Sequence, residues 1–413
     1  MKIHQCLIAS ALGVALAAPA SAASLFTPST EVVASHQRND AQAAGLPLRP
    51  STRSVQRIDA EPTALAADVL EFALLGAPVR AYRNRSQRLS EDGVVWFGEI
   101  GNEASRVQRA DHRMDPMNSV IIVRHNGRLT GSIRRDGQLF KLSPSSGSGH
   151  VLLEVDESRM PPDHPVDHHR LPQVAMPVSE PAGLAAGSSG SPTTIRVLVV
   201  VTDGAVAAYA GDMQALVQLA VAESNQGYID SNVGITLELA GYETTRYIES
   251  DRAGTDLSRF ISTRDGVMDS IHASRDEARA DVALLMGDIV GACGVASGIG
   301  STAATAFAVV NWICATGSHS FAHEIGHLQG ARHDIDTDRN TWPYAHGHGY
   351  RYQPQFGLRW RTIMAYDCIT RCRRLNFWSN PDINYNGVPT GIAHRADNRR
   401  VLIDTKASVA AFR

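Results

Sequence analysis

The chain has 413 residues, with 39 Lys and Arg against 42 Asp and Glu, and a formal net charge of −3. This balance gives no sign of attraction to nucleic acid or to a membrane surface, so we expect peptide or protein partners. The length exceeds what one hydrophobic core usually takes, which predicts two folded parts.

The N-terminus has the features of a signal peptide. Lys2 precedes an apolar run from Cys6 to Ala18, and Ala20-Ser21-Ala22 forms an A-x-A cleavage site. The run is too short and too rich in Ala for a membrane span, and no other stretch reaches the roughly 20 apolar residues that one needs. We predict a signal peptide at residues 1–22 and a secreted mature protein, extracellular or periplasmic.

Residues 23–157 have the pattern of a β-rich domain. A helical segment is expected at Ala64 to Leu75. Asn126-Gly127 and Asp136-Gly137 are typical of hairpin turns. Short strand-like runs lie at Val94 to Phe97, Ser119 to Arg124, Leu129 to Ile133, Gln138 to Leu142 and His150 to Val155.

Residues 158–194 have the composition of a linker. Seven Pro lie between Met160 and Thr194, together with Gly187-Ser188-Ser189-Gly190. The boundary between the two folded parts is therefore predicted here, and the second part is expected at residues 195–413.

The second part alternates strand and helix patterns, which predicts an α/β fold. Helical spacing marks Asp212 to Tyr228 and the segment around Val267 to Arg279. The predicted strands, which are apolar throughout or alternate with polar residues, are Ile195 to Val201, Ile235 to Leu239, Asp281 to Met286 and Ala306 to Asn311.

The string HEIGHLQGARHD, residues 323–334, contains the candidate metal ligands and the candidate catalytic base. On a helix, which Ser318 is placed to cap, His323 and His327 lie on one face and can reach a single Zn²⁺, while Glu324 points at a water on that metal. Gly330 permits a sharp turn that brings His333 to the third position. Three protein ligands leave one position open, as in a catalytic zinc site. A structural zinc or a histidine cluster without metal is the alternative.

The chain resembles the metzincin metallopeptidases, and within them the bacterial peptidyl-Asp metallopeptidases. The resemblance covers residues 195–413 and rests on HEIGHLQGARHD, on YAHGHGY at Tyr344 to Tyr350, on WRTIMAY at Trp360 to Tyr366, and on SNPDINYNGVPTG followed by DNRRVL. It implies an α+β catalytic domain with a twisted, mostly parallel sheet, a zinc helix and a Met-containing turn. It also places an edge strand at Gly294 to Ser297, which binds substrate as an added strand.

The same resemblance assigns roles to single residues. Met364 would underlie the three imidazoles, and Tyr366 would approach the zinc or the oxyanion, although a packed Tyr without a catalytic role is an equal alternative. A preference for cutting before Asp would need a cation near the scissile bond. The candidates are Arg371, Arg373 and Arg374, followed by Arg332, Arg359 and Arg361.

The function implied is that of a secreted zinc metalloendopeptidase made as a zymogen, with Glu324 as general base. Residues 23–157 would be a prodomain that inhibits the enzyme, joined to it by a cleavable linker. No Cys follows the signal peptide in this part, so Asp163-His164 or Asp167-His168-His169 are the candidates to block the zinc. The alternatives are an attached binding module, a solvated linker, a protease of broad specificity, and a binding or adhesion protein without turnover.

Four Cys remain after the signal peptide, and in an exported chain they suggest two disulfides. Local closure favours Cys293 with Cys314 and Cys368 with Cys372, while free or metal-binding thiols are the alternative. Ligation by His346 or His348 is disfavoured because both lie in the Gly-rich run His346-Gly347-His348-Gly349, which is typical of a loop. The run from Asp334 to Asn340 only partly matches an EF-hand loop. A calcium site of another kind is left open, and no motif supports it.

Overall fold

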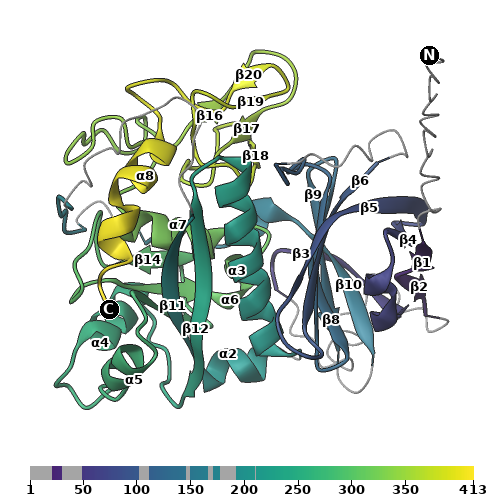
Figure 1. Ribbon diagram of the computed structural model, residues 1–413, viewed down its shortest axis with the longest axis horizontal. Helices are drawn as coiled ribbons and strands as arrows, with labels where there is room; N and C mark the ends of the chain where they lie inside the picture. Colours follow the sequence, from purple (N-terminus) through teal and green to yellow (C-terminus); the bar gives the residue numbers. More distant parts are fainter. Residues whose placement is uncertain are drawn as a thin grey trace, which may run out of the picture.

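The computed structural model describes residues 21–29, 49–101, 111–145, 149–165, 171–176, 192–209 and 211–413. Most of the predicted signal peptide and the candidate segment Asp167-His168-His169 lie outside these residues. Two sheets form two separate apolar cores, and helix α3 (Met213–Asp230) stands between them (Figure 1).

The N-terminal sheet has ten strands in the order β1-β4-β5-β6-β7-β8-β9-β10-β3-β2. All neighbours are antiparallel except β1 and β4. The two predicted hairpin turns have positive φ at Asn126, Gly127, Asp136 and Gly137, as such turns require. The bounds are β1 (Ala22–Ser24), β2 (Phe26–Pro28), β3 (Thr52–Ala60), β4 (Val69–Leu74), β5 (Ala77–Arg88), β6 (Val94–Ile100), β7 (Ser119–His125), β8 (Arg128–Arg135), β9 (Gln138–Pro144) and β10 (His150–Val155).

The helix expected at Ala64 to Leu75 was wrong. A short 3-10 turn, η1 (Pro62–Ala66), is followed by strand β4, which pairs with β5 across a turn at Leu75 and Gly76. Burial alternates from Leu70 to Leu74 in β4, and the tight turn closes a hairpin, so strand pairing overrides the local helical pattern. A second 3-10 turn, η3 (Glu157–Arg159), follows the sheet.

The C-terminal sheet has five strands in the order β12-β11-β13-β15-β14. Its strands are β11 (Thr193–Thr202), β12 (Ile235–Thr245), β13 (Val282–Gly287), β14 (Gly294–Ala296) and β15 (Phe307–Asn311). Only β14 runs antiparallel to its neighbour, and it forms one edge of the sheet. The mixed sheet with its helices is an α+β arrangement, and the predicted strands are confirmed.

Helices cover the C-terminal sheet. Helix α3 follows the cap residue Asp212 and covers the run predicted as helical from Asp212 to Tyr228, whereas the helix expected at Val267 to Arg279 is shorter. The remaining helices are α2 (Asp203–Ala208), α4 (Ala253–Ile261), α5 (Ile271–Glu277), α6 (Trp312–Ala315), α7 (Ser320–Leu328) and α8 (Asn398–Val409). Short strands between α7 and α8 are β16 (Arg351–Tyr352), β17 (Trp360–Arg361), β18 (Arg373–Arg374), β19 (Asn384–Tyr385) and β20 (Val388–Pro389).

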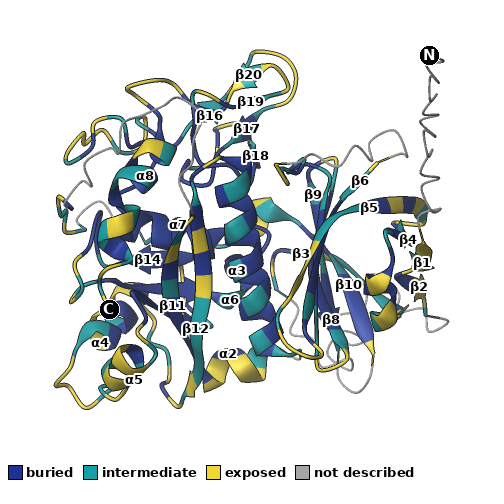
Figure 2. Cartoon of the chain, viewed as in Figure 1, coloured by how far each residue is buried: buried dark blue, intermediate teal, exposed yellow. Residues whose placement is uncertain are grey.

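Helix α3 is buried on most of its surface because both sheets contact it (Figure 2). Its Ala215, Leu219 and Ala222 join one apolar cluster with Phe97 and Ile121 of the N-terminal sheet. The two parts therefore share an apolar interface along one helix.

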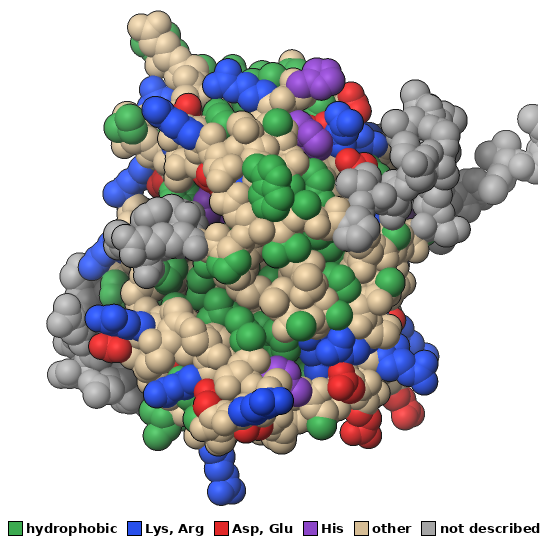
Figure 3. All heavy atoms as spheres, turned by 90° about the vertical axis from the view of Figure 1, so that its left-hand side faces the viewer, with side chains coloured by type: hydrophobic (Ala, Val, Ile, Leu, Met, Phe, Trp, Pro, Cys, Tyr) green, Lys and Arg blue, Asp and Glu red, His purple; other side chains and the backbone are tan. Residues whose placement is uncertain are grey.

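The opposite face of the C-terminal part carries apolar side chains near its middle, with Lys or Arg and Asp or Glu around them (Figure 3). Among the described residues, no helix is both long and apolar enough to cross a membrane.

Candidate metal centre

Helix α7 presents His323 and His327 one turn apart, as the motif predicts. The helix does not begin at a cap by Ser318, and that expectation was wrong. His319 takes the left-handed conformation at φ 62° and is the residue before the helix, while the Ser318 hydroxyl donates to the Cys314 carbonyl in α6. The side chain of His319 lies 3.3 Å from the buried Glu223 of α3, which fixes this entry to the helix.

The chain leaves α7 at Gly330, whose φ of +96° confirms the predicted turn. A Cβ there would lie 2.7 Å from Cε2 of Tyr344, so this position has no room for a side chain. The turn places His333 beside the other two imidazoles, with Nε2 separations of 3.1 Å from His323 and 2.9 Å from His327. His323 and His327 have their own Nε2 atoms 3.1 Å apart.

The other ring nitrogens are held by backbone carbonyls. The Nδ1 atoms of His323 and His327 lie 2.9 Å from the carbonyl oxygens of Ile363 and Ala331, so each Nδ1 donates and each Nε2 keeps a lone pair. All three rings are buried, and burial together with the neighbouring imidazoles lowers the pKa of His323 well below its ordinary value. Neutral imidazoles with converging lone pairs fit a divalent metal, because three nitrogens about 2 Å from one Zn²⁺ lie only about 3.4 Å apart.

Glu324 is fully buried beside the cluster, and neither carboxylate oxygen has a hydrogen-bond partner among the described residues. Burial raises its pKa well above the ordinary range. The carboxylate lies against strand β14, where a Cβ on Gly294 would come 2.5 Å from Oε1. Gly294 is therefore a residue of the site, which the sequence placed on the edge strand without showing what its missing side chain is for.

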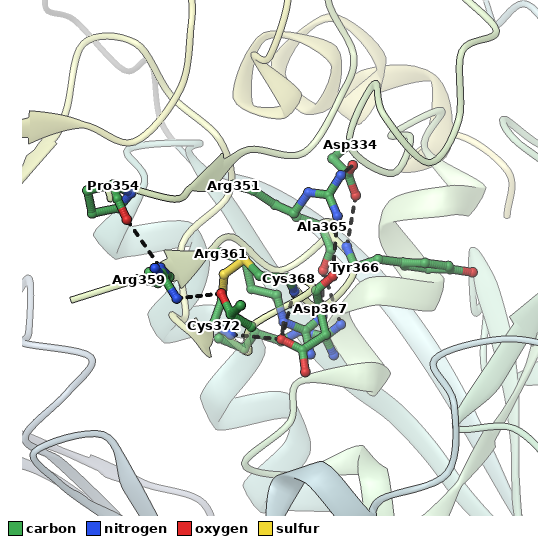
Figure 4. Close-up of a disulfide and its surroundings, with 12 residues drawn as sticks. Asp334, Arg351, Pro354, Arg359, Arg361, Ala365, Tyr366, Asp367, Cys368 and Cys372 are labelled. Carbon is green, nitrogen blue, oxygen red and sulfur yellow. Dashed lines mark hydrogen bonds and ion pairs between the residues drawn. A yellow bond between two sulfur atoms is a disulfide. The ribbon is translucent and has the colours of Figure 1, made fainter. Parts of the chain in front are cut away.

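Met364 and Tyr366 both contact the segment that carries the motif histidines. Met364 is buried under α7, with Sδ 3.0 Å from the position of a Cβ on Gly326, between the two helical His. The ring of Tyr366 is 4.5 Å from that of His333 and points away from the neighbouring disulfide loop (Figure 4). Its backbone N–H donates to Asp334 Oδ2 at 3.0 Å, so the Asp that ends the motif holds the turn that carries Tyr366.

A fourth imidazole enters the cluster from the predicted linker. His164 Nε2 lies 3.0 Å from Nε2 of His323 and of His327, and 2.8 Å from that of His333. We call these four side chains the histidine cluster. Within the described residues it is the one group of three or more His, Cys, Asp or Glu side chains placed to share an ion.

The residue before it, Asp163, lies between two arginines. Its Oδ2 is 2.5 Å from Arg374 Nη2 and 3.0 Å from Arg361 Nη1. Arg374 came from the first group of specificity candidates and Arg361 from the second. The structure brings only Arg374 of the first three to this place, because Arg371 is exposed and Arg373 lies 4.0 Å from Glu157.

The other candidates have structural partners. Arg332 is buried and binds the Trp342 carbonyl, and Arg359 binds the Pro354 carbonyl. His348 donates from Nδ1 to the His333 carbonyl, so it supports the third histidine of the motif rather than joining the cluster. Two carboxylates of the acidic run that partly matches a calcium loop form ion pairs with arginines. Asp334 lies 2.6 Å from Arg351, and Asp338 lies 2.5 Å from Arg332.

Both predicted disulfides are present. Cys293–Cys314 joins β14 to α6, and Cys368–Cys372 closes a loop beside Asp367, with Cα separations of 5.4 and 5.3 Å (Figure 4). The pairing expected from local closure of the chain is therefore confirmed.

Comparisons with known proteins agree with this site. Residues 191–379 match the model of metallopeptidase family M12, Reprolysin_5. A protein of Stenotrophomonas maltophilia strain R551-3 named peptidyl-Asp metalloendopeptidase is 57% identical over 404 residues, which is 97% of each chain. Relatives of the same name are 55% identical over 366 residues in Xanthomonas campestris pv. campestris, covering 88% of this chain and 87% of theirs, and 52% identical over 191 residues in Pseudomonas fragi, covering 46% and 100%.

Among solved structures, metalloproteinase-II of Bacteroides fragilis aligns with a TM-score of 0.38 at 15% identity, covering 65% of this chain and 81% of that one. Both the TM-score and the identity are low. The match to family M12 and the histidine site together define a zinc metalloendopeptidase. More narrowly, the chain belongs to the peptidyl-Asp metalloendopeptidase family.

Proposed function

We propose that the protein is a secreted endopeptidase, made as a zymogen, that cuts peptide bonds on the N-terminal side of Asp. The observation that carries the catalytic part is the convergence of three buried Nε2 atoms with the Glu324 carboxylate, which accepts no hydrogen bond from a described residue, beside them. The names of the relatives support the Asp preference.

Each residue of the site has a separate role in peptide-bond hydrolysis. His323, His327 and His333 hold the metal through Nε2. When bound, zinc supplies a Lewis acid that acidifies water and stabilises the oxyanion. Glu324 takes a proton from the attacking water and delivers it to the leaving amine. The backbone N–H groups of Cys293 and Gly294 donate to an extended chain, because they already bind the Pro162 and Asp163 carbonyls at 2.8 and 3.2 Å.

Two features support synthesis as a secreted zymogen. The N-terminus has the composition of a signal peptide. A segment that precedes the C-terminal sheet puts His164 among the three imidazoles, where a substrate carbonyl or the attacking water must enter. Residues 23–157 would then be the prodomain and residues 158–194 the linker that is cut.

The test is digestion of a protein mixture by the active form obtained from the full chain, followed by mass spectrometry of the products. We expect new N-termini that begin with Asp. Glu324→Ala should keep its zinc and lose turnover by several orders of magnitude, because the ligands survive while the proton acceptor is gone. Activity of this variant within tenfold of wild type would contradict the role of Glu324. A wild-type protein that binds zinc and cuts nothing would favour a binding protein.

A further inference from the structure

We propose that Arg361 and Arg374 form the pocket that selects the substrate aspartate, and that Asp163-His164 blocks the enzyme by filling this pocket and the open metal position together. The inference rests on the proposed function and names the residues behind its specificity and its regulation.

The two arginines are built into the site as a pair. Arg361 in β17 and Arg374 in β18 are register partners on adjacent parallel strands, so their side chains leave the backbone side by side. Arg374 Nη1 donates to the Ser318 carbonyl at 2.9 Å, and Arg361 Nη1 donates to the Ala365 carbonyl at 2.6 Å. Their side chains are only 3% and 12% exposed. Backbone carbonyls therefore hold two guanidinium groups in place before any ligand arrives.

A carboxylate is the ligand that such a pair requires. Two adjacent guanidinium groups out of solvent repel each other, and Asp163 Oδ2 compensates both at 2.5 and 3.0 Å. An Asn of the same shape offers a neutral oxygen, so it brings no negative charge to the two guanidinium groups. The pocket therefore discriminates by charge, and it accepts an acid at the position where Asp163 lies.

That position is adjacent to the metal centre. Asp163 is bound through its backbone carbonyl to Gly294 of the edge strand, and the next residue, His164, reaches the cluster. A substrate residue bound along β14 in this pocket would be next to the scissile bond. Asp163 therefore occupies the place of the selected substrate residue.

His164 completes the block. Its Nε2 is within 3.0 Å of all three motif imidazoles, and its Nδ1 lies 3.0 Å from the Gly294 carbonyl, which fixes the ring. Beyond the end of β14, Val174 N–H of the linker donates to the Ile299 carbonyl at 2.9 Å. Removal of this segment would free the acid pocket and the fourth metal position in one step.

The first test addresses the pocket. The active form is prepared from full chains carrying Arg361→Gln or Arg374→Gln, with trace wild-type enzyme added if processing is slow. The ratio of kcat/KM for two peptides that differ only in Asp or Asn after the scissile bond is then measured. We expect each variant to lower the Asp to Asn ratio at least tenfold while the Asn peptide changes less than threefold.

The matched control is Arg373→Gln, which removes a neighbouring charge that does not reach Asp163 and should keep the wild-type ratio. Arg374→Gln loses its hydrogen bond to Ser318 and could fail to fold. In that case, the Asp to Asn ratio of Arg361→Gln alone tests the pocket. An unchanged ratio in a folded Arg361→Gln enzyme would overturn the pocket. A wild-type enzyme without Asp preference would instead refute the proposed specificity itself.

The second test addresses the block and does not depend on turnover. Full-length Glu324→Ala precursor is loaded with zinc, and transfer of the metal to a chelator is followed. Adding His164→Ala should speed zinc release at least tenfold, while His168→Ala should not. Replacing zinc with Co²⁺ should give a visible spectrum that changes with His164→Ala and not with His168→Ala. Equal release rates and equal spectra for all three precursors would overturn the role of His164.

Discussion

At the scale of single residues, the site depends on which nitrogen of each imidazole is free. Carbonyls of Ile363 and Ala331 take the Nδ1 protons of His323 and His327, and this leaves both Nε2 lone pairs for a metal. The third motif histidine has its own support, because His348 binds its backbone carbonyl at 2.8 Å. Residues outside the ligand set therefore decide the geometry of the ligands.

Alanine variants of these histidines separate ligation from support. We expect His333→Ala to weaken zinc binding by at least a hundredfold, since it removes one of three motif nitrogens. His348→Ala should weaken it by about tenfold to a hundredfold through the backbone of His333. His346→Ala is the control, because this ring is outside the cluster. Zinc competition titrations check the order, and equal losses in all three would mean that the third ligand is wrongly assigned.

At the scale of elements, strand β14 does most to shape the site. It is short and lies at the edge of the sheet, and its Gly294 is in contact with both Glu324 and the segment of His164. The Cys293–Cys314 disulfide anchors the start of this strand to α6. Its loop spans 21 residues in sequence, against four for Cys368–Cys372.

The two disulfides should therefore differ in their effect on stability. In the chain-entropy model, a loop of the longer size contributes about 3 kcal/mol and the shorter one about 2 kcal/mol. We expect the double variant Cys293→Ser with Cys314→Ser to lower the urea midpoint of the Glu324→Ala precursor more than the double variant Cys368→Ser with Cys372→Ser. The reverse order would show that the short loop near the arginines stores more of the stability.

Strand β10 contains a histidine that makes stability depend on pH. His150 is 4% exposed, and its Nε2 accepts from the Leu129 N–H at 3.0 Å. Burial and the nearby Arg128 lower its pKa from 6.5 to about 4. Because the folded pKa lies below the unfolded one, the unfolded chain binds the proton first as pH falls.

The contribution of His150 is thus complete above pH 6.5 and is lost between pH 6.5 and about 4. We expect the Glu324→Ala precursor to lose about 2 kcal/mol of unfolding free energy over this window relative to the same chain with His150→Gln. Gln keeps an acceptor and does not titrate. Urea unfolding of both chains at pH 7 and pH 4.5 measures the difference, and parallel losses would exclude His150 as the source.

At the scale of the whole molecule, the N-terminal sheet is attached to the loop that leads into α7. Arg134 in β8 is buried, and its Nη2 donates to the Gly317 carbonyl at 2.6 Å and to Glu157 at 2.7 Å. This contact joins residues 183 apart in sequence. Together with the apolar surface of α3, it ties the proposed prodomain to the catalytic part.

Removing this contact should loosen the whole precursor. We expect Arg134→Met to lower the unfolding free energy by about 3 kcal/mol, because Glu157 and the Gly317 carbonyl lose a buried charged partner. The neighbouring Arg135→Met is the control, since Arg135 is less buried. Both substitutions are made in the full-length Glu324→Ala chain, and urea unfolding measures the loss of unfolding free energy. Equal losses would show that Arg134 does not stabilise the interface between the two parts.

The sequence by itself determined the features that depend on local spacing. Four-residue spacing put His323 and His327 on one helical face, Gly330 supplied a turn with positive φ, and loop length chose the disulfide pairs. It failed at Ala64 to Leu75 and at Ser318, where pairing with β5 and a bond to α6 override local preference.

Only the tertiary structure decided which distant side chains meet. Asp163 and His164 lie 211 and 169 residues from Arg374 and His333, and no local pattern encodes such a contact. The sequence offered two histidine segments as equals and six arginines in two ranked groups, with Arg374 in the first group and Arg361 in the second. The register of β17 with β18 and the path of the linker along β14 brought Arg361, Arg374, Asp163 and His164 together, because strand pairing fixes which side chains lie side by side.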